Sequence, residues 1–310
     1  MKQDHQPIIA VVGPTAIGKT GLSLKIAEQF SGEIIGVDSV QIYRYMDIGT
    51  AKPTPAERRH IPHHLIDVVN PDENYSVGRY VKDAEDAIKK VRQNNNIPII
   101  VGGTGLYLRS LLQGLFEIET GSPDIRSELK EKSQNNASRK ELYEELCQVD
   151  PEAAKRIHIN DTQRLIRALE IYRTTGITWS KHLQNRSIST KFANVLKIGL
   201  TCERELLYQR INTRVQVMID QGLKEEVRML LKNGFHEELN SMQSIGYRHM
   251  IAHLKGKWDI AKTKELLATD TRHYAKRQYT WFNNDPEIEW FTIEEHDMVL
   301  QRINRFLTKK

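Results

Sequence analysis

The feature that most constrains the fold of this chain is a glycine-rich turn at residues 13–20, which reads G-P-T-A-I-G-K-T. An uninterrupted apolar run at residues 8–12 precedes this turn, and apolar residues at helical spacing (Leu22, Ile26 and Phe30) follow it. A buried strand, a turn matching G-x-x-x-x-G-K-[ST] and a helix, in this order, are the context that a phosphate-binding loop requires. The sequence therefore predicts a P-loop α/β protein.

Further apolar runs predict the rest of the sheet. Residues 34–37 stop at Asp38, residues 97–101 stop at a second glycine-rich turn, and similar runs lie at residues 195–200 and 288–292. Strands that are apolar throughout are typical of parallel sheets covered by helices on both faces. We therefore expect a doubly wound parallel sheet that binds its ligands at the carboxyl edge of the strands.

The middle of the chain differs, because the segment at 116–192 contains no good strand and is polar and helical in pattern. We interpret it as an all-α insertion into the sheet. The predicted domains are a P-loop catalytic core with C-terminal helices, formed by residues 1–115 and 193–310, and a helical insertion domain at residues 116–192.

The residues of the glycine-rich turn have distinct expected roles. The amides of the turn and the N-terminus of the following helix point at an anion. Lys19 reaches the terminal phosphate, and Thr20 offers its hydroxyl to Mg²⁺. ATP, GTP and a prenyl diphosphate all satisfy such a loop. The predicted phosphate-binding residues are Gly13, Pro14, Thr15, Ala16, Ile17, Gly18, Lys19 and Thr20.

Asp38 follows the second predicted strand and therefore lies at the ligand-binding edge of the sheet. In a nucleotide hydrolase this carboxylate would hold Mg²⁺, and in a transferase it would accept a proton from the nucleophile. The neighbouring Ser39 makes a plain helix cap an equal alternative. The residues alone leave these interpretations open.

The charge balance permits a polyanionic partner without requiring one. Lysine and arginine total 45 against 40 acidic residues, a net charge of +5 at pH 7. Cys147 and Cys202 form no CxxC pair or zinc framework, which favours a reduced cytoplasmic setting. The N-terminal apolar run is too short for the core of a signal peptide, and no stretch approaches the length of a membrane span. We therefore expect a cytoplasmic protein.

The segment after the second strand carries a resemblance to a known family. Residues 38–53 read D-S-V-Q-I-Y-R-Y-M-D-I-G-T-A-K-P, which is similar to the signature of the tRNA dimethylallyltransferases. The family has a small residue at the position of Tyr45, so the local turn is expected to differ. No zinc finger like that of eukaryotic members follows, so the bacterial type is expected. Further matches, in the family's order, are H-H-L-I-D at 63–67, G-G-T-G-L-Y at 102–107, D-T-Q-R-L-I-R-A-L-E at 161–170, S-I-G-Y-R at 244–248 and T-R-H-Y-A-K-R-Q at 271–278.

This resemblance implies a reaction. A dimethylallyl group would move from dimethylallyl diphosphate to N6 of the adenosine adjacent, on the 3′ side, to the anticodon of a tRNA. The adenine amine is a poor nucleophile, so catalysis has to remove its proton and stabilise the departing diphosphate. The resemblance implies that Asp38 is the base, and that Lys19, Arg214 and Mg²⁺ on Thr20 receive the charge of the diphosphate.

The resemblance also implies where tRNA binds. A plain turn for Thr104 and a solvated basic face around Arg164 and Arg167 are the alternatives to RNA contact. The predicted contacts with the anticodon stem-loop are Asp38, Ser39, Val40, Gln41, Thr104, Gln163, Arg164, Leu165, Ile166 and Arg167.

Two groups near these predicted sites have a less specific pattern. Arg210 lies four residues before Arg214 and can share its helix side, but a surface ion pair is favoured for it. The segment at 271–281 interleaves charged and aromatic residues, which suits RNA, although core positions are favoured for Tyr279 and Trp281.

Three other functions fit part of the sequence. They are a small-molecule P-loop kinase, a prenyltransferase of free adenosine nucleotides, and a tRNA-binding protein without catalysis. The D-I-G-T-A-K-P segment argues against the first and the helical insertion against the second. Intact Lys19, Thr20 and Asp38 argue against the third, so we expect an enzyme, acting as a monomer.

Overall fold

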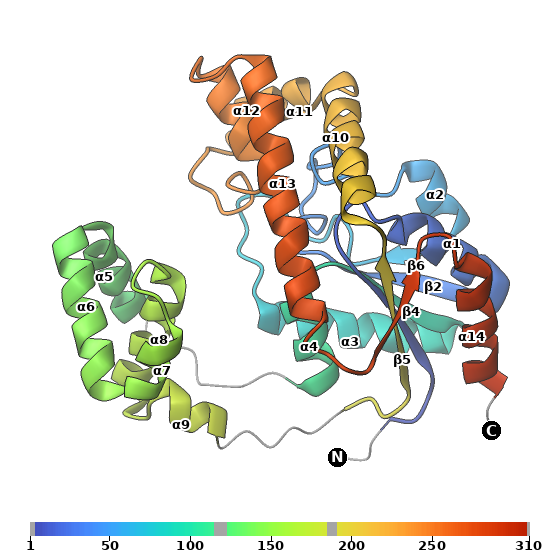
Figure 1. The fold of residues 1–310 in the computed structure, drawn as a ribbon, viewed down its shortest axis with the longest axis horizontal. Helices are drawn as coiled ribbons and strands as arrows, with labels where there is room; N and C mark the ends of the chain where they lie inside the picture. Colours follow the sequence, from blue (N-terminus) through green and yellow to red (C-terminus); the bar gives the residue numbers. More distant parts are fainter. Residues whose placement is uncertain (1–3, 115–122, 185–190, 309–310) are drawn as a thin grey trace. The chain divides into compact units, whose positions relative to one another are not determined.

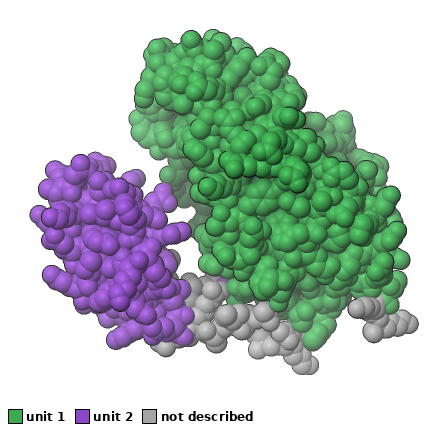
Figure 2. Space-filling model, viewed as in Figure 1, with its two compact units in different colours: residues 1–113, 190–310 green, residues 114–189 purple. Residues whose placement is uncertain are grey.

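The chain, analysed as a computed structural model, is described over residues 4–114, 123–184 and 191–308. It divides into two compact units, one formed by residues 1–113 with 190–310 and the other by residues 114–189 (Figure 2). Of the two predicted domain boundaries, the one at residues 115–116 lies outside the described residues.

The first unit is built on a six-stranded sheet with the order β3-β2-β4-β1-β5-β6, in which every recorded pairing is parallel (Figure 1). This confirms the predicted fold class. All five predicted strands are present, whereas β3 was not predicted. The strands are β1 (Ile8–Val12), β2 (Gly32–Val37), β3 (His63–His64), β4 (Ile97–Gly102), β5 (Val195–Thr201) and β6 (Ile288–Thr292).

Helices pack on both faces of the sheet. On one face, α1 and α14 pack on a buried cluster that includes Ile9, Ile99 and Ile198 of the central strands. On the other face, α3 and α4 contact β2, and α3 also contacts β4, as right-handed crossovers require. These helices are α1 (Lys19–Phe30), α3 (Val77–Gln93), α4 (Gly105–Gln113) and α14 (His296–Thr308).

A second hydrophobic cluster joins the signature segment to the C-terminal helices. Ile42 and Met46 of that segment pack with Val215, Tyr247 and Leu267, all of them buried. Among the described residues, no helix is both long and apolar enough to cross a membrane. The remaining helices of this unit are α2 (Pro55–His60), α10 (Arg204–Asp220), α11 (Leu223–Lys232), α12 (Tyr247–Leu254) and α13 (Ile260–Phe282).

The second unit is helical, and its described residues contain no strand. Leu129, Leu146, Leu165 and Leu169 lie in its buried core. Asp161 caps α8 by accepting a hydrogen bond from the amide of Arg164 at 3.2 Å. The helices are α5 (Pro123–Gln134), α6 (Asn136–Val149), α7 (Pro151–Arg156), α8 (Thr162–Thr175) and α9 (Trp179–Gln184).

Candidate active site at the phosphate loop

The phosphate loop connects the carboxyl end of β1 to the start of α1. Gly13 has φ +136°, and a Cβ atom there would come within 2.8 Å of the Leu200 carbonyl oxygen on the neighbouring strand β5. Only glycine fits such a backbone next to a second backbone. Lys19 is the first residue of α1, and Thr20 is exposed beside it. The loop therefore has the strand–turn–helix geometry that the motif predicts.

The Lys19 side chain folds back over this loop. Its Nζ atom donates hydrogen bonds to the carbonyl oxygens of Gly13 at 2.9 Å and Pro14 at 2.7 Å. The pKa of Lys19 is lowered to about 7: burial contributes most, the positive charge of Arg214 acts in the same direction, and the Asp38 carboxylate opposes both. An anion bound in the loop would favour the charged ammonium in the same way as Asp38 does.

Two arginines of α10 reach the loop. Arg214 donates from Nη1 to the Thr15 hydroxyl at 3.1 Å and from Nη2 to the Thr50 carbonyl oxygen at 3.4 Å. Arg210 donates from Nε to the Ala16 carbonyl oxygen at 2.8 Å. The surface ion pair favoured for Arg210 is therefore wrong, because its guanidinium contacts the phosphate loop. Sequence spacing placed both arginines on one side of the helix but could not identify what that side contacts.

Asp38 lies directly after β2 and is half-buried. Its Oδ1 atom accepts hydrogen bonds from the amides of Val40 at 2.8 Å and Gln41 at 3.1 Å. No helix begins there, so Asp38 closes a turn and the alternative of a helix cap is excluded. Both bonds use the same oxygen, which leaves Oδ2 to act on another group. Burial lowers the pKa of Lys19, and the negative charge of Asp38 opposes this effect.

Gln278 of α13 joins two loops at this site and was given no role from sequence. Its Oε1 atom accepts the Thr15 amide hydrogen at 2.8 Å, and its Nε2 atom donates to the Gly103 carbonyl oxygen at 3.0 Å. The Thr15 amide is therefore already bonded to Gln278. Tyr274 lies one helical turn before Gln278. Burial raises the pKa of Tyr274, and the charge of Asp38 acts in the same direction. The spacing of Tyr274 and Gln278 put them on one helix face, which was the available signal.

Thr104, Ser39 and Gln41 connect the loops around Asp38. The Thr104 hydroxyl accepts the Ser39 amide hydrogen at 3.2 Å. The Gln41 side chain donates to the Thr50 carbonyl oxygen at 3.1 Å. Val40, like these residues, is half-buried. The structure thus places the predicted tRNA contacts of the first unit at one edge of the sheet, next to Asp38.

The predicted contact segment of the second unit lies in the first half of α8. Gln163 and Arg164 are exposed, whereas the Leu165 side chain is 0% exposed within the core of the unit. The predicted contact between Leu165 and tRNA is therefore wrong for its side chain. Ile166 is half-buried and packs against the same core. Arg167 donates to Glu170 at 3.0 Å, and only 3% of the Glu170 side chain is exposed.

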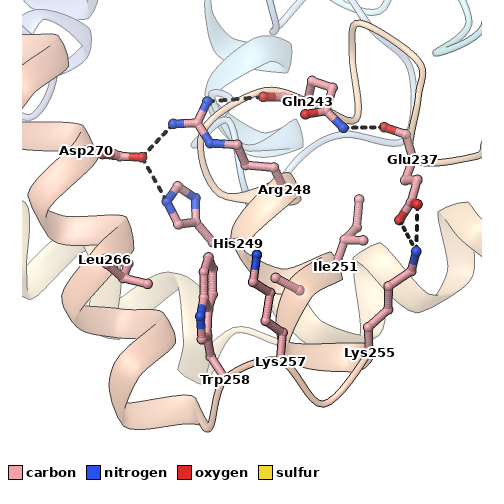
Figure 3. Close-up of a pocket in the computed structure, with 11 residues that line it drawn as sticks. Glu237, Gln243, Arg248, His249, Ile251, Lys255, Lys257, Trp258, Leu266 and Asp270 are labelled. Atoms are coloured by element: carbon pink, nitrogen blue, oxygen red, sulfur yellow. Dashed lines mark hydrogen bonds and ion pairs between the residues drawn. The ribbon is translucent and has the colours of Figure 1, made fainter.

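A separate pocket of about 420 Å³ lies among α12, α13 and the preceding loop (Figure 3). Asp270 accepts hydrogen bonds from Arg248 at 2.5 Å and, at 3.1 Å, pairs with His249. Glu237 accepts from Lys255 at 2.6 Å. Most charges of this pocket are thus paired within it, and no residue of the phosphate loop lines it. We therefore place the chemistry at the phosphate loop.

Comparisons with known proteins find similar sequences that cover nearly the whole chain. The family model described as IPP transferase matches residues 41–285, and the isopentenyl transferase model matches residues 6–75. A tRNA dimethylallyltransferase of Desulfotalea psychrophila is 48% identical over 307 residues, covering 99% of this chain and 98% of that protein.

Two solved structures are similar along nearly the whole chain. The tRNA isopentenylpyrophosphate transferase of Bacillus halodurans has a TM-score of 0.72 and 36% identity, over 99% of this chain and 97% of that chain. A eukaryotic dimethylallyltransferase acting on tRNA has a TM-score of 0.83 and 30% identity, over 98% of this chain and 80% of that chain.

Proposed function

The chain belongs to the tRNA dimethylallyltransferase family, and from this premise we propose how its phosphate-loop site carries out the transfer. The enzyme transfers a dimethylallyl group from dimethylallyl diphosphate to N6 of the adenosine adjacent, on the 3′ side, to the anticodon of tRNA. The observation that carries the proposal is the position of Asp38 and the phosphate loop at the carboxyl edge of the sheet, where Lys19 folds over the loop and Arg214 bonds its Thr15 hydroxyl.

Asp38 is the general base in this proposal. The lone pair of N6 forms a bond to C1 of the dimethylallyl group while the bond from C1 to the diphosphate oxygen breaks. The diphosphate leaves with that electron pair, and the N6 proton passes to Oδ2 of Asp38. Support comes from the hydrogen bonds of Oδ1, which hold the carboxylate in place and leave Oδ2 open.

The leaving diphosphate is bound by the loop and by two cations. Loop amides, Lys19 and Arg214 receive its charge, and a bidentate guanidinium contact suits its oxygens. When the diphosphate binds, Lys19 would give up its hydrogen bonds to the carbonyl oxygens of Gly13 and Pro14 and bond the diphosphate oxygens instead. Arg210 adjoins the same loop and adds positive charge beside it.

Mg²⁺ fits this site as an ion carried by the diphosphate. Within the described residues, no group of three or more acidic, histidine or cysteine side chains could hold a metal by itself. Mg²⁺ commonly keeps several waters and binds one or two protein groups plus substrate phosphates. The exposed Thr20 hydroxyl at the start of α1 is the protein group we assign to it. When bound, the ion would neutralise charge on the departing diphosphate.

The second substrate is the anticodon stem-loop of tRNA. We assign its contacts to Asp38, Ser39, Val40, Gln41 and Thr104 in the first unit. In the helical unit we assign them to Gln163, Arg164, Ile166 and Arg167. Cys147 and Cys202 are free thiols, which suits a cytoplasmic enzyme. A monomer suffices, because one chain supplies every residue assigned here.

Replacing Arg164 with glutamine should weaken tRNA binding and lower the slope of log affinity against log salt by about one unit, because one phosphate contact is lost. Arg164 suits this test because its side chain is 66% exposed and its Asp161 partner is 3.5 Å away. Titrating tRNA at several salt concentrations gives the slope. Lys140→Gln, also next to an acidic residue on the same unit, should leave it unchanged. An unchanged slope for Arg164→Gln would favour the solvated-face interpretation.

The proposed function is tested by incubating the enzyme with dimethylallyl diphosphate and unmodified tRNA. Digestion to nucleosides should yield N6-dimethylallyladenosine.

A further inference from the structure

Glu226, in the first turn of α11, receives four hydrogen bonds on one carboxylate. Its Oε2 atom accepts the amide hydrogens of Asp47 at 3.0 Å and Ile48 at 2.7 Å. Its Oε1 atom accepts the Gly49 amide hydrogen at 3.1 Å and the Tyr247 hydroxyl at 2.6 Å. Glu226 thus holds three successive amides of a segment that is neither helix nor strand.

A carboxylate suits this position for physical reasons. Successive amides that point to one place form an anion-binding concavity, and hydrogen bonds to a charged acceptor are stronger than neutral ones. Neighbouring contacts restrict the segment further. A Cβ atom on Gly49 would lie 2.5 Å from the Tyr247 ring. Lys52, at the other end, donates to Asp47 at 2.8 Å and Asp67 at 2.7 Å.

The held segment leads directly to the active site. The carbonyl oxygen of Thr50, one residue after Gly49, accepts hydrogen bonds from Arg214 at 3.4 Å and Gln41 at 3.1 Å. Arg214 also donates to the Thr15 hydroxyl in the phosphate loop. A shift of residues 47–49 would therefore move an acceptor of the guanidinium that binds the diphosphate.

We propose that Glu226 is a positioning residue for the transfer: it fixes residues 47–49 so that the Thr50 carbonyl oxygen orients Arg214 and Gln41. The inference rests on the function proposed for the phosphate-loop site. The four hydrogen bonds of Glu226 come from the amides of residues 47–49 and from Tyr247. Glu226 therefore acts on the transfer indirectly, through the position of Arg214.

The test is Glu226→Gln, which keeps the shape but replaces one acceptor oxygen with a donor that faces other donors. We expect kcat to fall about tenfold, since small displacements of a catalytic group are costly. The dissociation constant of inorganic pyrophosphate, measured by calorimetry, should rise by about the same factor, because Arg214 is misplaced. The matched control is Glu225→Gln on the same helix, whose carboxylate pairs with the exposed Arg228; it should change neither constant.

A purely stabilising role predicts a different result. In that case Glu226→Gln would lower the melting temperature but leave kcat and pyrophosphate affinity unchanged in the folded protein, which would overturn the proposal. If Glu226→Gln does not fold, Glu226→Asp serves instead. It keeps the charge on a shorter side chain that cannot reach all four donors, and unchanged constants would count equally against the proposal. Failure of the wild-type protein to prenylate tRNA would instead refute the proposed function.

Discussion

Replacing Asp38 with alanine is expected to lower the turnover of dimethylallyl transfer by about 10²–10⁴-fold, the usual contribution of a general base. Without this carboxylate, N6 has no group to take its proton as the new bond forms. Affinity for tRNA should change much less, because many contacts share it. Single-turnover transfer with saturating dimethylallyl diphosphate measures the first quantity, and filter binding of labelled tRNA measures the second.

Asp38→Asn separates the base from the turn that Asp38 also closes. The asparagine oxygen can still accept the amide hydrogens of Val40 and Gln41, but the side chain no longer binds a proton. We therefore expect Asp38→Asn to be about as slow as Asp38→Ala. Turnover near that of the wild type in Asp38→Asn would remove Asp38 from the role of base.

Lys19→Ala should reduce turnover by about 10²–10³-fold, the loss seen when one donor to a developing anion is removed. Lys19 is the cation of the loop itself, whereas Arg214 reaches the site from α10 and is held there by Thr15 and Thr50, so it cannot move into the position of the Lys19 ammonium. Binding of tRNA should be nearly unchanged. Excess chelator should also abolish transfer, and full activity in chelator would contradict the role assigned to Thr20.

The titration of Lys19 adds a pH dependence to this prediction. Burial lowers its pKa to about 7. Below that pH the free enzyme already carries the proton that diphosphate binding requires. Above it, the proton has to be taken up on binding, so pyrophosphate affinity should fall as pH rises. Lys19→Ala controls for the titration of pyrophosphate itself, and an identical pH profile in both proteins would contradict the assignment.

Much of the fold could be predicted because buried parallel strands are apolar throughout. The strands at residues 8–12, 34–37 and 97–101 have this pattern, and the helical unit was predicted from its lack of such runs. Strand β3 was missed because it contains only His63 and His64, which pair with β2 without any apolar pattern. Its pairing depends on where Ile34 and Ile35 of β2 lie in space, and no local preference encodes that.

The site could be predicted only where one continuous motif builds it. The phosphate loop and Asp38 each follow a strand, so strand position alone brings them to one edge. Gln278 bonds a loop amide 263 residues earlier in the chain, and Glu226 bonds an amide 179 residues earlier. Such contacts depend on how α11 and α13 pack. Leu165 shows the converse: a contiguous motif suggested a contact, but helical periodicity turns its side chain into the core.

The most direct test of the central claim asks which group is transferred to tRNA from the substrate bound in the phosphate loop, a phosphoryl or a dimethylallyl group. Unmodified tRNA is incubated with the enzyme and Mg²⁺, in one tube with ATP labelled in its terminal phosphate and in another with dimethylallyl diphosphate labelled in its carbon chain. The account predicts label in adenosine beside the anticodon only in the second tube, and its appearance there should be slower by about 10²–10⁴-fold with Asp38→Asn. Phosphorylated product in the first tube, with no labelled adenosine in the second, would contradict it.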